Sequence, residues 1–186
     1  MGEVGRTSCP PELDPFRSLT PRAREIAVVA RELVETEGWD AWSMHRLASR
    51  LGIRAPSLYK HYSGKSAVRA VLAGVALAEM GEALHAVLER GGGVTELLRS
   101  YREVAMANPG LYRVATTGAL PRAQLPEGLE HWAGAPFVIL AGEAERGRVL
   151  WSLAHGMTIL ELDGRYPADA VPESTILAAA AMFSRN

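Results

Sequence analysis

Six cationic side chains lie in a stretch of the sequence that contains no carboxylate. Residues 41–78 hold no Asp or Glu and carry a net charge of +6, whereas the whole chain of 186 residues carries -1. The flanking stretches, residues 1–40 and 79–186, carry -3 and -4. Such a local excess of positive charge predicts an anionic partner that binds at one place, although a solvated helical face is the alternative interpretation. The six cations are Arg46, Arg50, Arg54, Lys60, Lys65 and Arg69.

Residues 54–60 include the types of side chain that contact base edges in a DNA duplex. A guanidinium such as that of Arg54 can donate two hydrogen bonds to O6 and N7 of guanine, and Lys60 can reach a base or a phosphate. Ala55 and Pro56 offer apolar contact, for instance with a thymine methyl group. We therefore expect this segment to contribute the base contacts of a DNA-binding surface.

Two short helices are predicted around these residues. Ser43 is a suitable N-cap for the first helix, which Gly52 ends, and Pro56 fits the first turn of the second. Only Ile53 and Arg54 separate the glycine from the start of the second helix. Two short helices that meet at a glycine turn, the second of them basic, are typical of a helix-turn-helix.

The sequence LGIRAPSLYKHY at residues 51–62, followed by Lys65, resembles the DNA-binding signature of the tetracycline-repressor (TetR) family. That signature combines a glycine turn, a Leu-Tyr pair, a histidine before an aromatic residue and a lysine three residues later. The resemblance covers residues 20–75. It implies that the first of these two short helices reaches toward a base through His45, and that the phosphates are contacted by Ser43, Ser57, Tyr59, His61 and Lys65.

Other roles are open for several of these residues. Leu58 is expected in the core, and Tyr59 and Tyr62 can pack there with their hydroxyl groups at its edge. His61 can brace the turn as a hydrogen-bond donor. The prediction of DNA binding therefore depends on the combination of residues and not on any one of them.

A second resemblance lies in the other half of the chain. The sequence WSLAHG at residues 151–156 is similar to the Trp-x-x-x-His-Gly (WHG) hallmark of one C-terminal subgroup of the TetR family, and NPGLYR at residues 108–113 is similar to an accompanying element. Membership of the family implies a homodimer whose C-terminal helices pair and a small-molecule pocket that controls DNA affinity.

The spacing of Trp151 and His155 places both on one face of a helix. They are expected to form a pocket wall, or else to pack tightly against a neighbouring helix beside Gly156. Further candidates for contact with a ligand, any of which can also be core, are Tyr101, Met106, Trp132, Phe137 and Met157.

The remaining periodicity predicts helices and no sheet, so the expected fold class is all-α. Residues 1–19 are expected to form a flexible tail, residues 20–66 a three-helix DNA-binding domain, and residues 67–186 a helical domain for effector binding and dimerisation. A long helix that begins at Lys65 joins the two domains. Later helices are expected over residues 94–107, 143–162 and 172–183, the last two in the dimer interface, with a broken segment at 108–142.

Two other classes of function are weighed against a dimeric DNA-binding regulator. One is a helical ligand-binding protein or enzyme with a pocket centred on His155, and the other is a helix-turn-helix used for protein contacts. No metalloprotease, nucleophile-elbow or phosphate-loop spacing occurs, so catalytic residues, metals and cofactors are not expected. The single Cys9 excludes an internal disulfide, and the lack of a long uninterrupted apolar run predicts a cytoplasmic protein without a membrane span.

Overall fold

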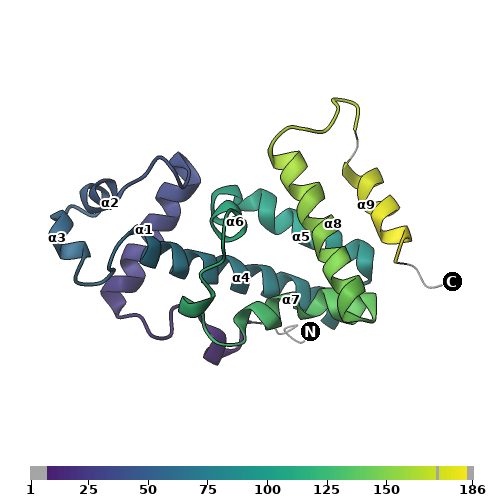
Figure 1. The fold of residues 1–186 in the computed structure, drawn as a ribbon, viewed down its shortest axis with the longest axis horizontal. Coiled ribbons are helices and arrows are strands. Elements are labelled where there is room, and N and C mark those ends of the chain that lie inside the picture. Colours follow the sequence, from purple (N-terminus) through teal and green to yellow (C-terminus); the bar gives the residue numbers. More distant parts are fainter. Residues whose placement is uncertain (1–7, 171, 184–186) are drawn as a thin grey trace, which may run out of the picture. The chain divides into compact units, whose positions relative to one another are not determined.

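The computed structural model describes residues 8–170 and 172–183, and these residues form helices linked by turns, as the sequence predicted (Figure 1). No strand occurs in these ranges. The elements are η1 (Pro11–Leu13), α1 (Pro21–Glu37), α2 (Met44–Arg50), α3 (Ala55–Leu58), α4 (Lys65–Glu89), α5 (Val94–Ala107), α6 (Pro109–Thr116), η2 (Arg122–Gln124), α7 (Leu129–Ala141), α8 (Ala144–Leu162) and α9 (Pro172–Ala181).

The helix starts follow the local signals in the sequence. The Thr20 hydroxyl accepts a hydrogen bond from the Ala23 amide at 3.2 Å, and a proline occupies the first turn of α1. Helix α4 begins at Lys65, as predicted, and α5 spans Val94–Ala107, as predicted. The segment expected to be broken holds the short helices α6 and η2 followed by α7.

Internal contacts divide the chain into two compact units. The first, called here the N-terminal unit, consists of Pro10–Ala78 and Asn108–Leu129, and so contains α6 in addition to the helix-turn-helix. Its core joins α1, α2, α3 and the first half of α4 through large buried side chains, the largest of which are Trp42, Ile26, Leu47, Leu58 and Leu72. The division of the chain into functional domains at residue 66 remains a prediction.

Part of the segment expected to be a flexible tail lies against the N-terminal unit. Leu13 is buried, and Phe16 and Leu19 pack against the core of this unit. The Arg24 guanidinium lies 5.6 Å from the centre of the Phe16 ring and donates a hydrogen bond to the Phe16 carbonyl. Residues 1–7 of the expected tail lie outside the described residues.

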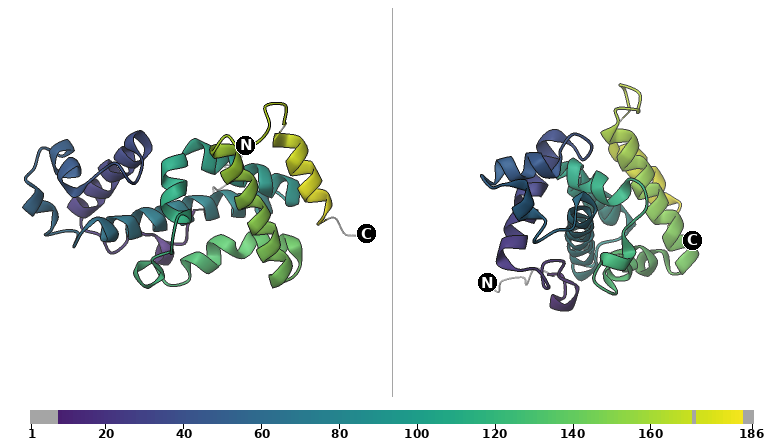
Figure 2. Two further views of the ribbon diagram at one scale, coloured as in Figure 1. Left: turned by 45° about the horizontal axis from the view of Figure 1, so that its top comes forward. Right: turned by 60° about the vertical axis from the view of Figure 1, so that its left-hand side comes forward.

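The second compact group, called here the C-terminal unit, contains Glu79–Ala107 and the described residues from Glu130 onward. Helices α5, α8 and α9 contact one another within it (Figure 2). Tyr101 of α5 meets Phe137 of α7 edge-on, with ring centroids 5.8 Å apart, and both side chains are buried. These contacts form a core separate from that of the N-terminal unit.

Helix α4 is long and apolar enough, by length and composition alone, to cross a membrane, although no span is expected from the sequence. Half of its apolar stretch is buried inside the protein. Val68, Leu72 and Ala73 of this helix belong to the core of the N-terminal unit. A core helix packed on several sides has the same composition, so this is weak evidence for a span.

Candidate nucleic-acid interface

The geometry of the turn between α2 and α3 follows from its sequence. The Ser43 hydroxyl caps α2 by accepting a hydrogen bond from the Arg46 amide at 3.2 Å. Gly52 has a φ of 66°, in the left-handed region that glycine adopts without steric cost, and this conformation lets the chain reverse after α2. Helix α3 then begins with Arg54 at its N-cap and Pro56 in its first turn. A short helix is thereby presented directly after a tight turn.

The burial of the side chains on and after α3 shows which of them pack in the core and which lie at the surface. Leu58 is fully buried and Tyr62 is 3% exposed, whereas Tyr59 is 54% exposed. The Tyr62 hydroxyl donates to the Ala23 carbonyl at 2.8 Å, so this side chain is part of the core. Burial also raises the pKa of Tyr62 to about 12. Of the two tyrosines, only Tyr59 has its ring at the surface.

Most of the predicted DNA-contacting residues lie at the surface of the N-terminal unit. Helices α2 and α3 contact each other, which brings residues of both helices together. Ala55 and Ser57 are half-buried. The exposed members of the predicted set are Ser43, His45, Arg54, Pro56, Tyr59, Lys60 and His61.

Two of the six cations in residues 41–78, Arg46 and Arg69, bind other groups of the N-terminal unit. The Arg46 guanidinium donates two hydrogen bonds to one Glu37 oxygen, at 3.0 Å from Nε and 2.7 Å from a terminal nitrogen, and the hydrogen bond lowers the pKa of that carboxyl group. Arg69 donates to the carbonyl groups of Thr117 and Ala119. Part of the positive charge of residues 41–78 is therefore neutralised by a carboxylate or used in hydrogen bonds to carbonyl groups. The composition alone does not reveal this.

Lys65 is placed differently from the exposed candidates. Its side chain is half-buried, and its ammonium group donates hydrogen bonds to the carbonyl oxygens of Trp39 and Trp42 at 2.6 Å and 2.9 Å. The two tryptophan rings themselves meet edge-on, with centroids 5.3 Å apart. The sequence carried no signal for this contact, because it joins residues more than twenty positions apart.

The seven candidates for ligand contact do not form one pocket in the C-terminal unit. Tyr101 and Phe137 are buried against each other, and Met106 is 37% exposed. Trp151 is 51% exposed, and its ring centroid lies 6.5 Å from that of His155. Burial lowers the pKa of His155. Neither Trp151 nor His155 lines either of the two cavities described in this unit.

Trp132 has a partner that the sequence does not indicate. Its ring stacks on His85 of α4 with centroids 4.7 Å apart, and its carbonyl oxygen lies 3.0 Å from His85 Nε2. The indole also covers Gly81, where a Cβ would overlap the ring. Gly81 and His85 are one helical turn apart, but nothing in the sequence indicates which residue covers them.

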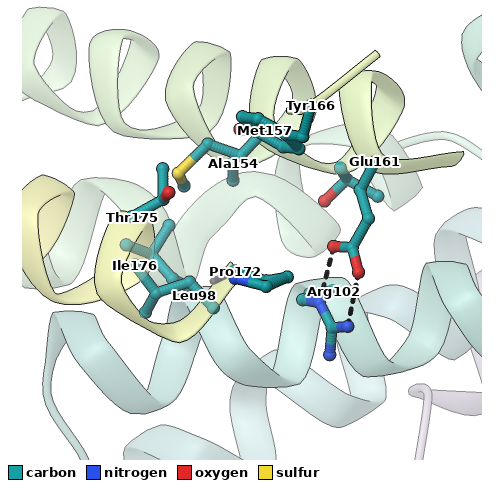
Figure 3. Close-up of a pocket in the computed structure, with 10 residues that line it drawn as sticks. Leu98, Arg102, Ala154, Met157, Glu161, Tyr166, Pro172, Thr175 and Ile176 are labelled. Carbon is teal, nitrogen blue, oxygen red and sulfur yellow. Dashed lines mark hydrogen bonds and ion pairs between the residues drawn. The ribbon is translucent and has the colours of Figure 1, made fainter. Parts of the chain in front are cut away.

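Met157 is the candidate that does line a cavity, which α5, α8 and α9 enclose (Figure 3). The cavity volume is about 10 Å³, the space of a single water. An ion pair between Arg102 and Glu161 borders it, with nitrogen–oxygen distances of 2.7 Å and 2.5 Å. The residues of this pair are 59 positions apart, so sequence spacing could not have found them.

Comparison with known proteins connects this surface to a family. Residues 26–71 match the family model described as bacterial regulatory proteins of the tetR family, and residues 94–183 match that of a tetracyclin repressor-like C-terminal domain. Together the two matches span most of the chain. The more specific expectation of a WHG-type C-terminal domain remains a prediction.

Individual relatives agree with the family models. The uncharacterized HTH-type transcriptional regulator Rv0681 of Mycobacterium tuberculosis is 28% identical over 84% of this chain and 79% of its own length. The uncharacterized HTH-type transcriptional regulator YobS of Bacillus subtilis is 34% identical over 48% of this chain, and the match spans about half of its length (49%).

Solved structures share the fold. A putative regulatory protein, SCO4313, aligns with a TM-score of 0.71 at 20% identity, over 87% of this chain and 94% of its own. A TetR/AcrR-family regulator from Thermobifida fusca aligns with a TM-score of 0.60 at 18% identity, over 88% and 97%. At these identities the likeness concerns the fold alone, and it confirms the predicted fold class.

Proposed function

The chain belongs to the TetR family of DNA-binding transcriptional regulators, and we propose that it is a cytoplasmic homodimeric repressor that a small molecule releases from its operator. The observation that carries the DNA-binding part is the exposed, basic helix-turn-helix. Arg54, Tyr59 and Lys60 are exposed on or beside α3, in a sequence window without any acid. In this proposal α3 enters the major groove, Arg54 contacts a guanine, and the neighbouring exposed side chains bind phosphates.

A helix-turn-helix used only for protein contacts is the alternative, and the charge distribution favours DNA. Phosphates attract lysine and arginine side chains and repel carboxylates, so a DNA-facing surface excludes Asp and Glu. A protein-binding face has no such requirement. The acid-free window at residues 41–78 therefore supports the operator-binding proposal.

Dimerisation is proposed through α8 and α9. Both helices carry large apolar side chains that are exposed in the described part of the chain, and Trp151 and Leu177 are 51% and 50% exposed. A Cβ added at Gly156 would meet no atom within 4 Å, so open space lies beside this glycine on the same helix as Trp151. A second copy of the chain would bury these side chains and place two recognition helices on one duplex.

The effector site is proposed in the C-terminal unit, on the strength of its match to the C-terminal family model. The cavity beside Met157 has room for about one water, so an effector of ordinary size would have to widen it or bind elsewhere in this unit. Release from DNA would follow if the effector binds better to a dimer geometry that does not fit the operator. The candidate contacts remain Tyr101, Met106, Trp132, Phe137, Trp151, His155 and Met157.

Selection from a pool of random duplexes tests the DNA-binding proposal. The purified protein should enrich a near-palindromic sequence whose half-sites lie about 34–36 Å apart, one helical turn of DNA. Its affinity for that duplex should fall steeply with salt, because binding releases counterions from the phosphates. Failure to enrich any sequence at moderate salt would instead favour a helix-turn-helix that contacts protein.

A further inference from the structure

The ammonium group of Lys65 is enclosed by the turn between α1 and α2. Besides its hydrogen bonds to the carbonyl oxygens of Trp39 and Trp42, it lies 4.6 Å and 5.0 Å from the centroids of the two indole rings. Lys65, Trp39 and Trp42 are called here the lysine clasp. The three residues belong to the N-terminal unit, and Lys65 is the first residue of α4.

The chemistry of the clasp uses most of the binding capacity of the ammonium group. A lysine ammonium has three N–H donors, and two of them donate to carbonyl groups here. The indole rings add cation–π attraction, which acts within about 6 Å of a ring centroid. Trp42 is 1% exposed, and its Nε1 has no hydrogen-bond partner, so packing and ring contacts hold this indole. Burial lowers the pKa of Lys65, and Asp40 has a smaller opposite effect.

The clasp also joins the two ends of the helix-turn-helix. After Trp42 the chain enters the N-cap of α2, passes through α2 and α3, and returns to α4 at Lys65. The hydrogen bond from Lys65 to the Trp42 carbonyl therefore ties the exit of the motif to its entry. This tie adds to the contacts that the apolar core makes between the motif and α4.

We propose that Lys65 is a positioning residue of the DNA-binding surface, which fixes the helix-turn-helix to the start of α4 and does not contact a phosphate. The proposal rests on the proposed DNA-binding function and replaces the phosphate contact that the family resemblance implied for Lys65. Orientation matters because both recognition helices of a dimer must fit major grooves one helical turn apart. Loss of the clasp lowers affinity through misorientation and leaves the number of phosphate contacts unchanged.

Two matched variants separate positioning from phosphate contact. Lys65→Met and Lys60→Met each remove one charge and retain an unbranched side chain, but Lys60 is exposed and Lys65 is in the clasp. Binding to the duplex enriched by selection, and to a random-sequence duplex, is measured across a range of salt. Lys65→Met should bind the enriched duplex about tenfold more weakly with the salt slope of the wild type. Lys60→Met should lower the slope by about one unit per subunit.

A spectroscopic readout without DNA reports the clasp directly. Two of the four tryptophans of the chain contact Lys65, so tryptophan emission and its quenching by acrylamide should change in Lys65→Met. Lys60→Met should leave both at the wild-type values. Circular dichroism shows whether each variant remains folded.

Trp39→Leu keeps the proposal testable if Lys65→Met does not fold. It retains Lys65 and both carbonyl groups but removes one ring of the clasp, so it should weaken DNA binding at an unchanged salt slope. A Lys65→Met slope reduced as much as that of Lys60→Met, or wild-type affinity in Trp39→Leu, would overturn the positioning role. A wild-type protein without salt-dependent DNA binding would overturn the proposed function. The measurement on the wild type alone therefore distinguishes failure of the proposed function from failure of the positioning role.

Discussion

At the scale of single residues, Arg54 is the side chain best placed to read sequence. It occupies the N-cap of α3 and is exposed, so its guanidinium extends from the end of the helix that enters the groove in the proposed complex. Arg54→Ala should relax the preference at one base pair per half-site, at a cost of about 1–3 kcal/mol. Competition among operator duplexes changed at one position each measures this effect.

Lys60→Ala is the control for Arg54→Ala, because Lys60 is also exposed and lies on the same segment. It should weaken binding to all duplexes alike, as expected for a phosphate contact. A uniform loss in Arg54→Ala across the operator variants would identify Arg54 as a backbone contact instead.

We expect the buried hydroxyl group of Tyr62 to make the protein less stable at alkaline pH. Its hydroxyl is buried and donates to the Ala23 carbonyl, and its pKa is raised to about 12 from the ordinary value of about 10. The neutral phenol therefore makes its full contribution to the free energy of unfolding below about pH 10, and this contribution is lost as the pH rises through about 12. Complete ionisation of Tyr62 would lower the free energy of unfolding by about 3 kcal/mol, as the difference between a pKa of about 12 and one of about 10 implies.

Tyr62→Phe should lower the free energy of unfolding by about 1 kcal/mol near neutral pH, because it removes one buried hydrogen bond. The variant should also lose less stability than the wild type between about pH 10 and pH 12. Urea unfolding at a series of pH values measures both effects. Tyr59→Phe, at an exposed position, is the control and should match the wild type; parallel alkaline losses in all three proteins would refute the assignment.

At the scale of elements, α6 is held at both ends by charges that match its dipole. The Glu35 carboxylate accepts hydrogen bonds from the Gly110 and Leu111 amides at 2.9 Å and 2.7 Å, at the N-terminus of the helix. The Arg69 guanidinium of α4 donates to the carbonyl groups that follow its C-terminus. Because a Cβ at Gly110 would lie 2.5 Å from the Val34 carbonyl oxygen, only glycine permits α1 and α6 to approach this closely. Helix α6 therefore connects α1 to α4.

Glu35→Ala should destabilise the protein by about 1–2 kcal/mol, because two amides at the start of α6 lose a charged acceptor. Urea denaturation followed by circular dichroism measures the loss. Glu32→Ala, on the exposed side of the same helix, is the matched control and should change stability by less than about 0.5 kcal/mol. Equal effects of the two substitutions would show that Glu35 contributes nothing through α6.

At the scale of the whole molecule, apolar side chains on α8 and α9 predict a dimer. Trp151→Ala should raise the dimer dissociation constant at least about tenfold, since large aromatic side chains dominate interface energies. Sedimentation equilibrium measures the dissociation constant, and the melting temperature of the wild type should rise with protein concentration. Val28→Ala is the control, because Val28 is also exposed (47%) but belongs to α1. A concentration-independent monomer in the wild type would overturn the dimer.

Local signals in the sequence determined the helices and the motif. Caps, prolines and glycines predicted that α2 starts after Ser43, that α4 starts at Lys65 and that a turn occurs at Gly52, because these features depend on neighbouring residues. The family signature within residues 51–62 likewise needed no tertiary information, and the family model confirms it.

Only the tertiary structure decided which of the six cations are bound by other groups of the protein. Arg46 pairs with Glu37 although its side chain is 58% exposed, Lys65 enters the clasp and Arg69 binds the end of α6. Arg50, Arg54 and Lys60 are exposed.

The same holds for the surface position of Trp151, the stacking of Trp132 on His85 and the contact of α6 with α1. Helical periodicity places a side chain on a face of its helix, but the chain segment that covers this face comes from elsewhere in the sequence. Contacts between distant residues are therefore decided by packing, which no local pattern encodes.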